Sequence, residues 1–325
     1  MPGGPFVCIV LSPVLEKLLQ TLMDGLAVGS LYALIALGYT MVYGILKFIN
    51  FAHSDVFVLG AWISFVAATK AAGHLWEAGQ TPPWWGGVFI LLVSMTACAL
   101  VGFTIERLAY KPLRKAPRLN VLITAIGVSL FLQNIGQTEW LFGTRPARMP
   151  ALVAQDVPLA TIAGVKVWLV DVLGFGTAVL LMFALDRLVF HSTLGRAMRA
   201  VSYNPPIAAL MGINVDRIIS ITFVIGASLA AAAGFLYGQK YPGLNQPAAP
   251  VWVLLGLKAF VAAVIGGIGN VHGAMMGGIL IGLLEFFGAA YISSELRDVY
   301  VFSLLIIVLL VRPSGIFGKS TVEKV

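Results

Sequence analysis

Polar side chains interrupt two apolar stretches of this sequence, one near residue 50 and one near residue 270. Each interruption is a turn with glycine and isoleucine, followed by an asparagine and then a histidine two or three residues later. In membrane transporters, matching interruptions in two halves of a chain indicate broken helices beside the transport path, because backbone groups freed there need protein or water partners. The candidate substrate-path residues are Asn50, His53, Asp55, Asn270 and His272. Two ordinary turns between membrane spans explain the pattern nearly as well.

Lys258 and Glu285 are charged residues inside otherwise apolar stretches. Each lies about seven residues from the outer end of its expected span, which places both roughly 10 Å deep on the same side. Charges at that depth are expensive and usually face the protein interior in pairs. We therefore expect an intramembrane ion pair, which either orients two helices or contacts a substrate. Three weaker polar candidates, more typical of hydrogen bonds between helices, are Asp24, Gln133 and Asn134.

A polar, basic segment near the middle of the chain carries its own helix signals. Asn204 is a good N-cap, Pro205 suits the first helical position, and Gly212 is a natural stop. The helix expected from Pro205 to Met211 is only about 10 Å long. One face of this helix carries Ile207, Leu210 and Met211, and two arginines, Arg196 and Arg199, precede it. An apolar face on a short helix outside the lipid indicates a protein partner, which favours docking over a loop that only joins two spans.

Catalytic, metal and nucleotide sites are not indicated. Gly318-Lys319-Ser320 resembles the end of a phosphate-binding loop, but the pattern needs glycine at 313 and the sequence has Pro313. His53 and Asp55 are two ligands, which do not make a metal site. Cys8 and Cys98 are far apart and imply no disulfide framework. We expect no catalytic residues, no metal and no cofactor in this chain.

The composition is that of a membrane protein. Hydrophobic residues make up 59% of the 325 residues and charged residues only 11%, and the mean hydropathy is +0.93; ordinary soluble domains carry about 25% charged residues. We predict an all-α polytopic transmembrane bundle of about eight or nine spans, with broken helices near the substrate path. The expected spans are 20–46, 52–70, 86–106, 120–138, 166–186, 218–238, 251–268, 274–291 and 296–311.

The whole chain, 1–325, reads as one transmembrane domain, because no polar connection is long enough to bury a core. Its parts are 18–186, a coupling loop at 187–217, and 218–325. Three small-residue motifs predict close helix packing. They are Gly25-x-x-x-Gly29, Gly273-x-x-x-Gly277 and Gly278-x-x-x-Gly282.

Basic residues predict the orientation. Thirteen of the 21 Lys and Arg lie at Lys47, in the connections 107–118 and 187–217, and in the C-terminal tail, all expected on one face. Six lie on the opposite side. The net charge of +7 is thereby explained by loops on one side of a membrane, with no need for nucleic acid. We place the basic face and the C-terminus in the cytoplasm, and the N-terminus outside.

Several motifs together resemble the LivH-type permease of branched-chain amino-acid ABC importers. The resemblance covers the chain from about residue 20 to its end and rests on the motifs Gly38-Tyr-Thr-Met-Val-Tyr-Gly-Ile, Ile49-Asn-Phe-Ala-His, Thr104-Ile-Glu-Arg-Leu-Ala-Tyr-Lys-Pro-Leu-Arg, Leu194-Gly-Arg-Ala-Met-Arg-Ala, Ala259-Phe-Val-Ala-Ala-Val-Ile-Gly-Gly-Ile-Gly and Arg312-Pro-Ser-Gly-Ile-Phe-Gly. Ser54-Asp55 stands where family members often have Gly-Glu.

The resemblance implies a fold of the ribose-permease type in a bacterial cytoplasmic (inner) membrane. It also implies three kinds of partner besides membrane lipid: a sister permease of the LivM type, two ATPase subunits and a periplasmic substrate-binding protein. The segment Asn204–Gly212 matches the coupling helix that docks into an ATPase. Two alternatives stay open: a urea or short-amide ABC permease, and a proton-coupled secondary carrier with His53, Asp55 or Glu285 as proton sites.

Overall fold

The computed structural model describes residues 13–72, 74–75, 83–114, 116–153, 158–162 and 164–318. Lys319 and Ser320 of the rejected phosphate-loop match lie outside the described residues, as do Cys8 and the end of the C-terminal tail. The helices are α1 (Pro13–Leu46), α2 (His53–Ala71), α3 (Trp84–Ile105), the π-helical turn η1 (Glu106–Tyr110), α4 (Arg118–Gly136), α5 (Leu169–His191), α6 (Thr193–Tyr203), α7 (Pro205–Leu210), α8 (Val215–Lys240), α9 (Pro250–Gly266), α10 (Val271–Tyr291) and α11 (Arg297–Val311).

The all-α polytopic fold is confirmed. Seven of the described helices are long and apolar enough to cross a membrane. Two more expected spans correspond to the shorter helices α9, of 17 residues, and α11, of 15 residues. The expected span 166–186 begins too early, because residues 165–168 form strand β3 and the helix starts only at Leu169.

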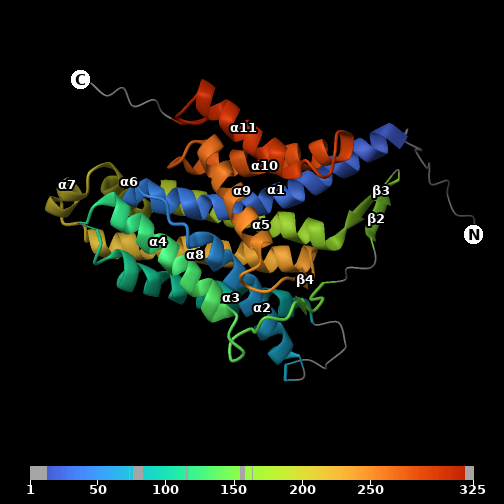
Figure 1. The fold of residues 1–325 in the computed structure, drawn as a ribbon, viewed down its shortest axis with the longest axis horizontal. Helices are drawn as coiled ribbons and strands as arrows, with labels where there is room; N and C mark the ends of the chain where they lie inside the picture. Colours follow the sequence, from blue (N-terminus) through green and yellow to red (C-terminus); the bar gives the residue numbers. More distant parts are fainter. Residues whose placement is uncertain are drawn as a thin grey trace, which may run out of the picture.

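Four short strands lie at one end of the bundle. Strand β1 (Ala147–Arg148) pairs antiparallel with β4 (Gly243–Leu244), and β2 (Pro158–Ile162) pairs antiparallel with β3 (Val165–Trp168). Figure 1 shows these strands at the right of the long axis, with α6 and α7 at the left. We call the two ends the strand end and the α7 end.

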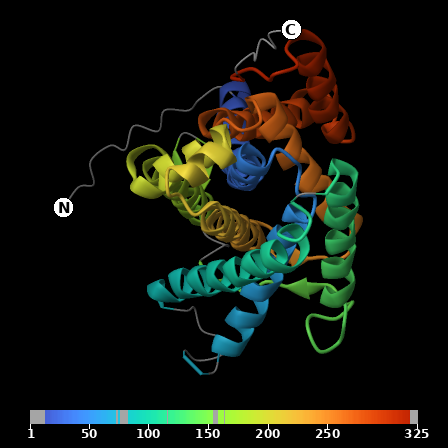
Figure 2. The same cartoon turned by 90° about the vertical axis from the view of Figure 1, so that its left-hand side faces the viewer.

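Helices α1 and α8 form the centre of the bundle, whereas α4 and α5 lie at its periphery. Every residue of α1 from Ala27 to Val42 is buried, and so are most residues of α8 from Ile218 to Gln239. By contrast, α4 exposes large apolar side chains such as Ile123 and Phe131. In Figure 2, viewed from the α7 end, α4 stands on the outside of the assembly. Such an apolar outer face is what lipid requires.

A seam of glycines joins α1 to α10, as the small-residue motifs predict. A Cβ atom at Gly25 would lie 3.1 Å from the side chain of Leu283, and one at Gly29 would lie 2.9 Å from Cα of Ile279. Cβ atoms at Gly278 and Gly282 would overlap the backbone of α1. The two backbones therefore approach as closely as glycine allows. Gly273 and Gly277 likewise face the backbone of α9.

The chain re-enters the bundle between α1 and α2. His53, the first residue of α2, packs against Gly38, which lies eight residues before the end of α1 at Leu46. At 1.5 Å per residue, α2 therefore begins about 12 Å inside the bundle. Lys47, with a φ of 57°, turns the backbone at the start of this return. The turn between α9 and α10 differs, because it lies near the end of α1, beside Gly44.

Candidate functional site

Helix α7 presents an exposed apolar face. Oδ1 of Asn204 accepts a 3.1 Å hydrogen bond from the backbone N–H of Ile207, and Gly212 ends the segment with a φ of 83°. The helix ends at Leu210, one residue earlier than expected, and Met211 is its C-cap. The exposed large apolar and aromatic residues are Tyr203, Ile207, Leu210 and Met211, with 92%, 55%, 87% and 78% exposure. We call these four residues the α7 surface.

Tyr203 is a member of the α7 surface that the sequence analysis did not include. It lies at the end of α6, just before the cap residue, where the pattern of α7 alone could not reveal it. Arg196 and Arg199 were also expected to contribute to docking of the partner. Arg199 instead donates a hydrogen bond to the backbone oxygen of Val189 and lies 5.6 Å from the ring of Phe190. Arg199 thereby fastens α6 to α5, while Arg196 is exposed.

An ion network lies behind the α7 surface, at the start of α8. Arg114 bridges the carboxylates of Asp216 and Glu106, and Lys111 lies 2.7 Å from Asp216. Glu106 is fully buried and also accepts a 2.5 Å hydrogen bond from the hydroxyl of Ser220. Glu106 is the first residue of η1. Its buried carboxylate is paired with the guanidinium of Arg114 and the hydroxyl of Ser220, because a buried charge is costly without such partners.

The segment of residues 50–55, which leads into α2, carries three of the expected path residues inside the bundle. Oδ1 of Asn50 accepts a 2.6 Å hydrogen bond from the hydroxyl of Tyr110 in η1. Oδ1 of Asp55 accepts a 2.9 Å bond from Nε2 of Gln133 on α4. All three path residues of this segment, including His53, are buried.

His53 and Asp55 each keep one polar atom without a hydrogen-bond partner in the described part of the chain. These atoms are Nε2 of His53 and Oδ2 of Asp55. The imidazole of His53 fits beside Gly38 and Gly226, and its centroid lies 4.8 Å from that of the Tyr39 ring. A buried polar atom without a partner is costly, and it is the feature that favours a functional role for this segment.

The other two expected path residues, Asn270 and His272, lie at the start of α10. Asn270 caps α10 through a 3.2 Å bond from the N–H of Gly273, and its amide donates to the backbone oxygen of Phe317. His272 is exposed, lies 2.7 Å from Asp186 and stacks on Phe190. No hydrogen bond or ion pair between described residues joins this pair to Asn50, His53 or Asp55. The structure therefore does not assemble the five path residues into one site.

Lys258 and Glu285 come together towards the strand end. Lys258 Nζ lies 3.0 Å from Oε1 of Glu285, whose Oε2 accepts a 2.9 Å hydrogen bond from the hydroxyl of Tyr32. Lys258 also lies 2.7 Å from Asp298 of α11. The sequence analysis missed Asp298, because nothing in its spacing links it to Lys258. This charged cluster lines a cavity of about 220 Å³.

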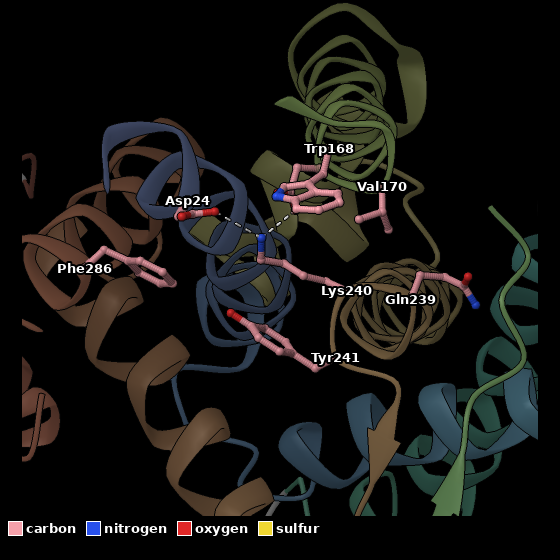
Figure 3. Close-up of a pocket in the computed structure, with 8 residues that line it drawn as sticks. Asp24, Trp168, Val170, Gln239, Lys240, Tyr241 and Phe286 are labelled. Atoms are coloured by element: carbon pink, nitrogen blue, oxygen red, sulfur yellow. Dashed lines mark hydrogen bonds and ion pairs between the residues drawn. The ribbon is translucent and has the colours of Figure 1, made fainter. Parts of the chain in front are cut away.

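A second cavity, of about 350 Å³, lies at the same end (Figure 3). Lys240 occupies its centre, 2.5 Å from Asp171 and 3.6 Å from Asp24. Asp24 thus contacts α8 through an ion pair, whereas its hydrogen bond, from Gln20, lies within α1 and not between helices as expected. Tyr241 and Phe286 line both cavities, so the two are neighbours. Within the described ranges, no three His, Cys, Asp or Glu side chains gather as a metal site would need.

Comparison with known protein families identifies the family to which this chain belongs. The sequence model of the family described as "Branched-chain amino acid transport system / permease component" matches residues 21–311. The chain belongs to this family. The permease is also 44% identical over 315 residues to the high-affinity branched-chain amino acid transport system permease protein BraD of Pseudomonas aeruginosa, covering 96% of this chain and 100% of BraD.

Other relatives carry the same description. LivH of Escherichia coli K12 is 42% identical over 318 residues, which cover 94% of the permease and 97% of LivH. A probable branched-chain amino acid transport permease protein LivH of Methanocaldococcus jannaschii is 28% identical over 96% of each chain. No solved structure matches the permease. As a member of this family of permease components, the protein is a transport subunit and not an enzyme. Its seven long apolar helices agree with a multi-pass membrane protein.

Proposed function

We propose that this permease carries branched-chain amino acids inward across a bacterial cytoplasmic membrane as one subunit of an ATP-driven importer. The family match and the names of the full-length relatives support this substrate class. The proposed complex holds a sister permease of the LivM type, two ATPase subunits and a periplasmic substrate-binding protein. The α7 end and the C-terminus face the cytoplasm, in keeping with the basic connections at that end.

The observation that carries the energy-coupling part of the proposal is the α7 surface. A helix of six residues is marginal by itself in water, yet α7 has a capped start, and the α7 surface presents four exposed apolar or aromatic side chains. Such a patch on a soluble face marks a protein interaction site. The sequence has no intact phosphate-binding loop, so in an ATP-driven importer a partner subunit would hydrolyse the ATP, and we place that ATPase on the α7 surface.

Two connections link the α7 surface to the centre of the bundle. Helix α7 leads directly into α8 through Gly212, and Ser202 of α6 donates a 2.5 Å hydrogen bond to the backbone oxygen of Gly44 in α1. Movement of α6 and α7 would therefore act on the two central helices. Alternating access needs such a connection, because a ligand or nucleotide shifts a conformational equilibrium only through contacts that differ between the states.

The test replaces Leu210 with aspartate in the complex co-expressed with its partner subunits. Ala209→Asp is the matched control, because it places the same charge on the same helix, about 100° away from Leu210 and off the apolar face. We expect Leu210→Asp to lower ATP-driven leucine uptake in proteoliposomes at least about tenfold, since a charge would be buried without a partner. The control should retain uptake.

Two results would contradict the proposal. Normal uptake and normal co-purification of the ATPase subunits with Leu210→Asp would exclude docking at the α7 surface. Uptake that continues without ATP and stops when the proton gradient is removed would instead support a proton-coupled carrier, for which the unpaired atoms of His53 and Asp55 are the specific observation.

A further inference from the structure

The 220 Å³ cavity at the strand end combines an apolar wall with charges of both signs. Its wall includes Val28 of α1 and Leu254 and Leu255 of α9. Its charged lining is Lys258 and Glu285, both buried, and Arg297 and Asp298 at the start of α11. Cavities for drug-sized ligands measure roughly 300–1,000 Å³, so this cavity suits a smaller molecule.

The charges at the mouth are not fully used by the fold. Asp298 is half-exposed, and Lys258 is its only charged partner among the described residues. Arg297 is exposed and lies 5.3 Å from the ring of Phe286, with no carboxylate in ion-pair distance in the described ranges. A guanidinium without a carboxylate partner and a half-exposed carboxylate are therefore neighbours along the chain, next to an apolar wall.

A purely structural role leaves these features unexplained. Buried ion pairs contribute little net stability, because desolvation offsets their attraction, and a helix-orienting pair needs only Lys258 and Glu285. It needs neither an open cavity beside it nor an additional cation at the mouth. Charged groups at this depth in a membrane protein are usually functional.

We propose that this cavity is a subsite for a zwitterionic α-amino acid with a branched apolar side chain. Arg297 binds the α-carboxylate, Asp298 binds the α-ammonium, and Leu254 and Leu255 contact the side chain. Lys258 and Glu285 hold Asp298 and the cavity floor in place. This subsite rests on the proposed function of the permease and adds to it a place where substrate enters from the strand end.

The first test changes the size of the cavity. Leu254→Trp fills it, whereas Val253→Trp is the matched control, since Val253 is a neighbour on α9 with similar exposure that does not line the cavity. In the full complex in proteoliposomes, we expect Leu254→Trp to raise the KM for leucine at least about tenfold. Val253→Trp should leave the KM unchanged, and both variants should co-purify with the ATPase subunits.

A second variant keeps the test independent of folding defects. Leu254→Ala enlarges the cavity, so we expect the ratio of phenylalanine uptake to leucine uptake to rise about tenfold, whereas Leu254→Trp should lower this ratio because it leaves less room for the larger side chain. Misfolding lowers both uptakes together and does not produce opposite changes in preference. Arg297→Gln should raise the KM for leucine without changing the ratio, because it removes only the partner of the carboxylate.

The outcomes separate the subsite from the proposed function. If the wild-type complex takes up leucine and both Leu254 variants keep its KM and its ratio of phenylalanine uptake to leucine uptake, the subsite is wrong and the proposed function stands. A wild-type complex that hydrolyses ATP but accumulates no branched-chain amino acid would contradict the proposed function, and this result appears before any variant is compared.

Discussion

The phenol of Tyr110 donates a 2.6 Å hydrogen bond to Oδ1 of Asn50, which ties η1 to the segment that re-enters the bundle before α2. Tyr110 and Glu106 are the last and first residues of η1. The same five-residue turn therefore contacts the ion network behind α7 on one side and the buried start of α2 on the other. π-Helical turns are rare and occur often at functional sites.

We expect Tyr110→Phe to destabilise the permease, because Oδ1 of Asn50 would remain buried without its donor. Such a loss costs about 1–3 kcal/mol. The measurement is the thermal unfolding midpoint of the complex in detergent, together with ATPase stimulation by loaded binding protein. Tyr43→Phe is the control, since the Tyr43 hydroxyl makes no hydrogen bond within the described residues. Equal midpoints for the two variants would show that the bond to Asn50 is unimportant.

Glu106 and Arg114 should behave as a coupled pair. Glu106→Gln leaves Arg114 with one carboxylate partner fewer at a buried position, and removing one member of a buried pair costs about 3–5 kcal/mol. The double variant Glu106→Gln with Arg114→Met should be less destabilised than the sum of the single variants. Asp216→Asn, at the exposed end of the network, should change stability by less than about 1 kcal/mol. Additive effects of Glu106→Gln and Arg114→Met would refute the coupling.

Glycine-to-alanine variants should have opposite effects at two places. At Gly278 the added methyl would overlap the backbone of Ala33, so we expect destabilisation of about 1–3 kcal/mol. At Gly127 on α4 nothing lies within 4 Å of the added methyl, so alanine should be neutral or stabilising by up to about 1 kcal/mol. Size-exclusion profiles after heating would report both. A stable Gly278→Ala variant would contradict the close seam between α1 and α10.

The cap of α7 can be tested separately from its apolar face. Asn204→Ala removes the oxygen that accepts from Ile207 and should destabilise the local helix by about 1 kcal/mol. Asn204→Asp keeps an acceptor and should restore it. Hydrogen exchange of the backbone amides of residues 207–211 in the purified complex is the direct measurement. Equal exchange in the alanine and aspartate variants would mean that the partner alone holds α7 in shape.

The sequence was sufficient for features that depend on local pattern. Composition and span length identified the membrane bundle, and cap and stop residues placed α7 within one residue. The glycine motifs predicted the seam between α1 and α10, because small residues at that spacing have one main use in membranes.

Features that depend on packing between distant segments were not predictable. Asp298 meets Lys258 only because α11 packs beside α9 and α10, and Tyr110 meets Asn50 only because α2 begins inside the bundle. The similar Asn and His spacings near residues 50 and 270 suggested equivalent breaks. The structure instead uses Asn270 to cap a helix and hold Phe317.

The contact between Gly29 and Gly282 has a consequence for movement. Helices that interlock through large side chains must change rotamers before one can slide along the other. At Gly29 and Gly282, by contrast, the nearest atoms across the seam are backbone atoms of the facing helix. We therefore expect the glycine part of this seam to permit shear, the small sliding of packed helices by which many proteins change shape, without rotamer changes at these positions.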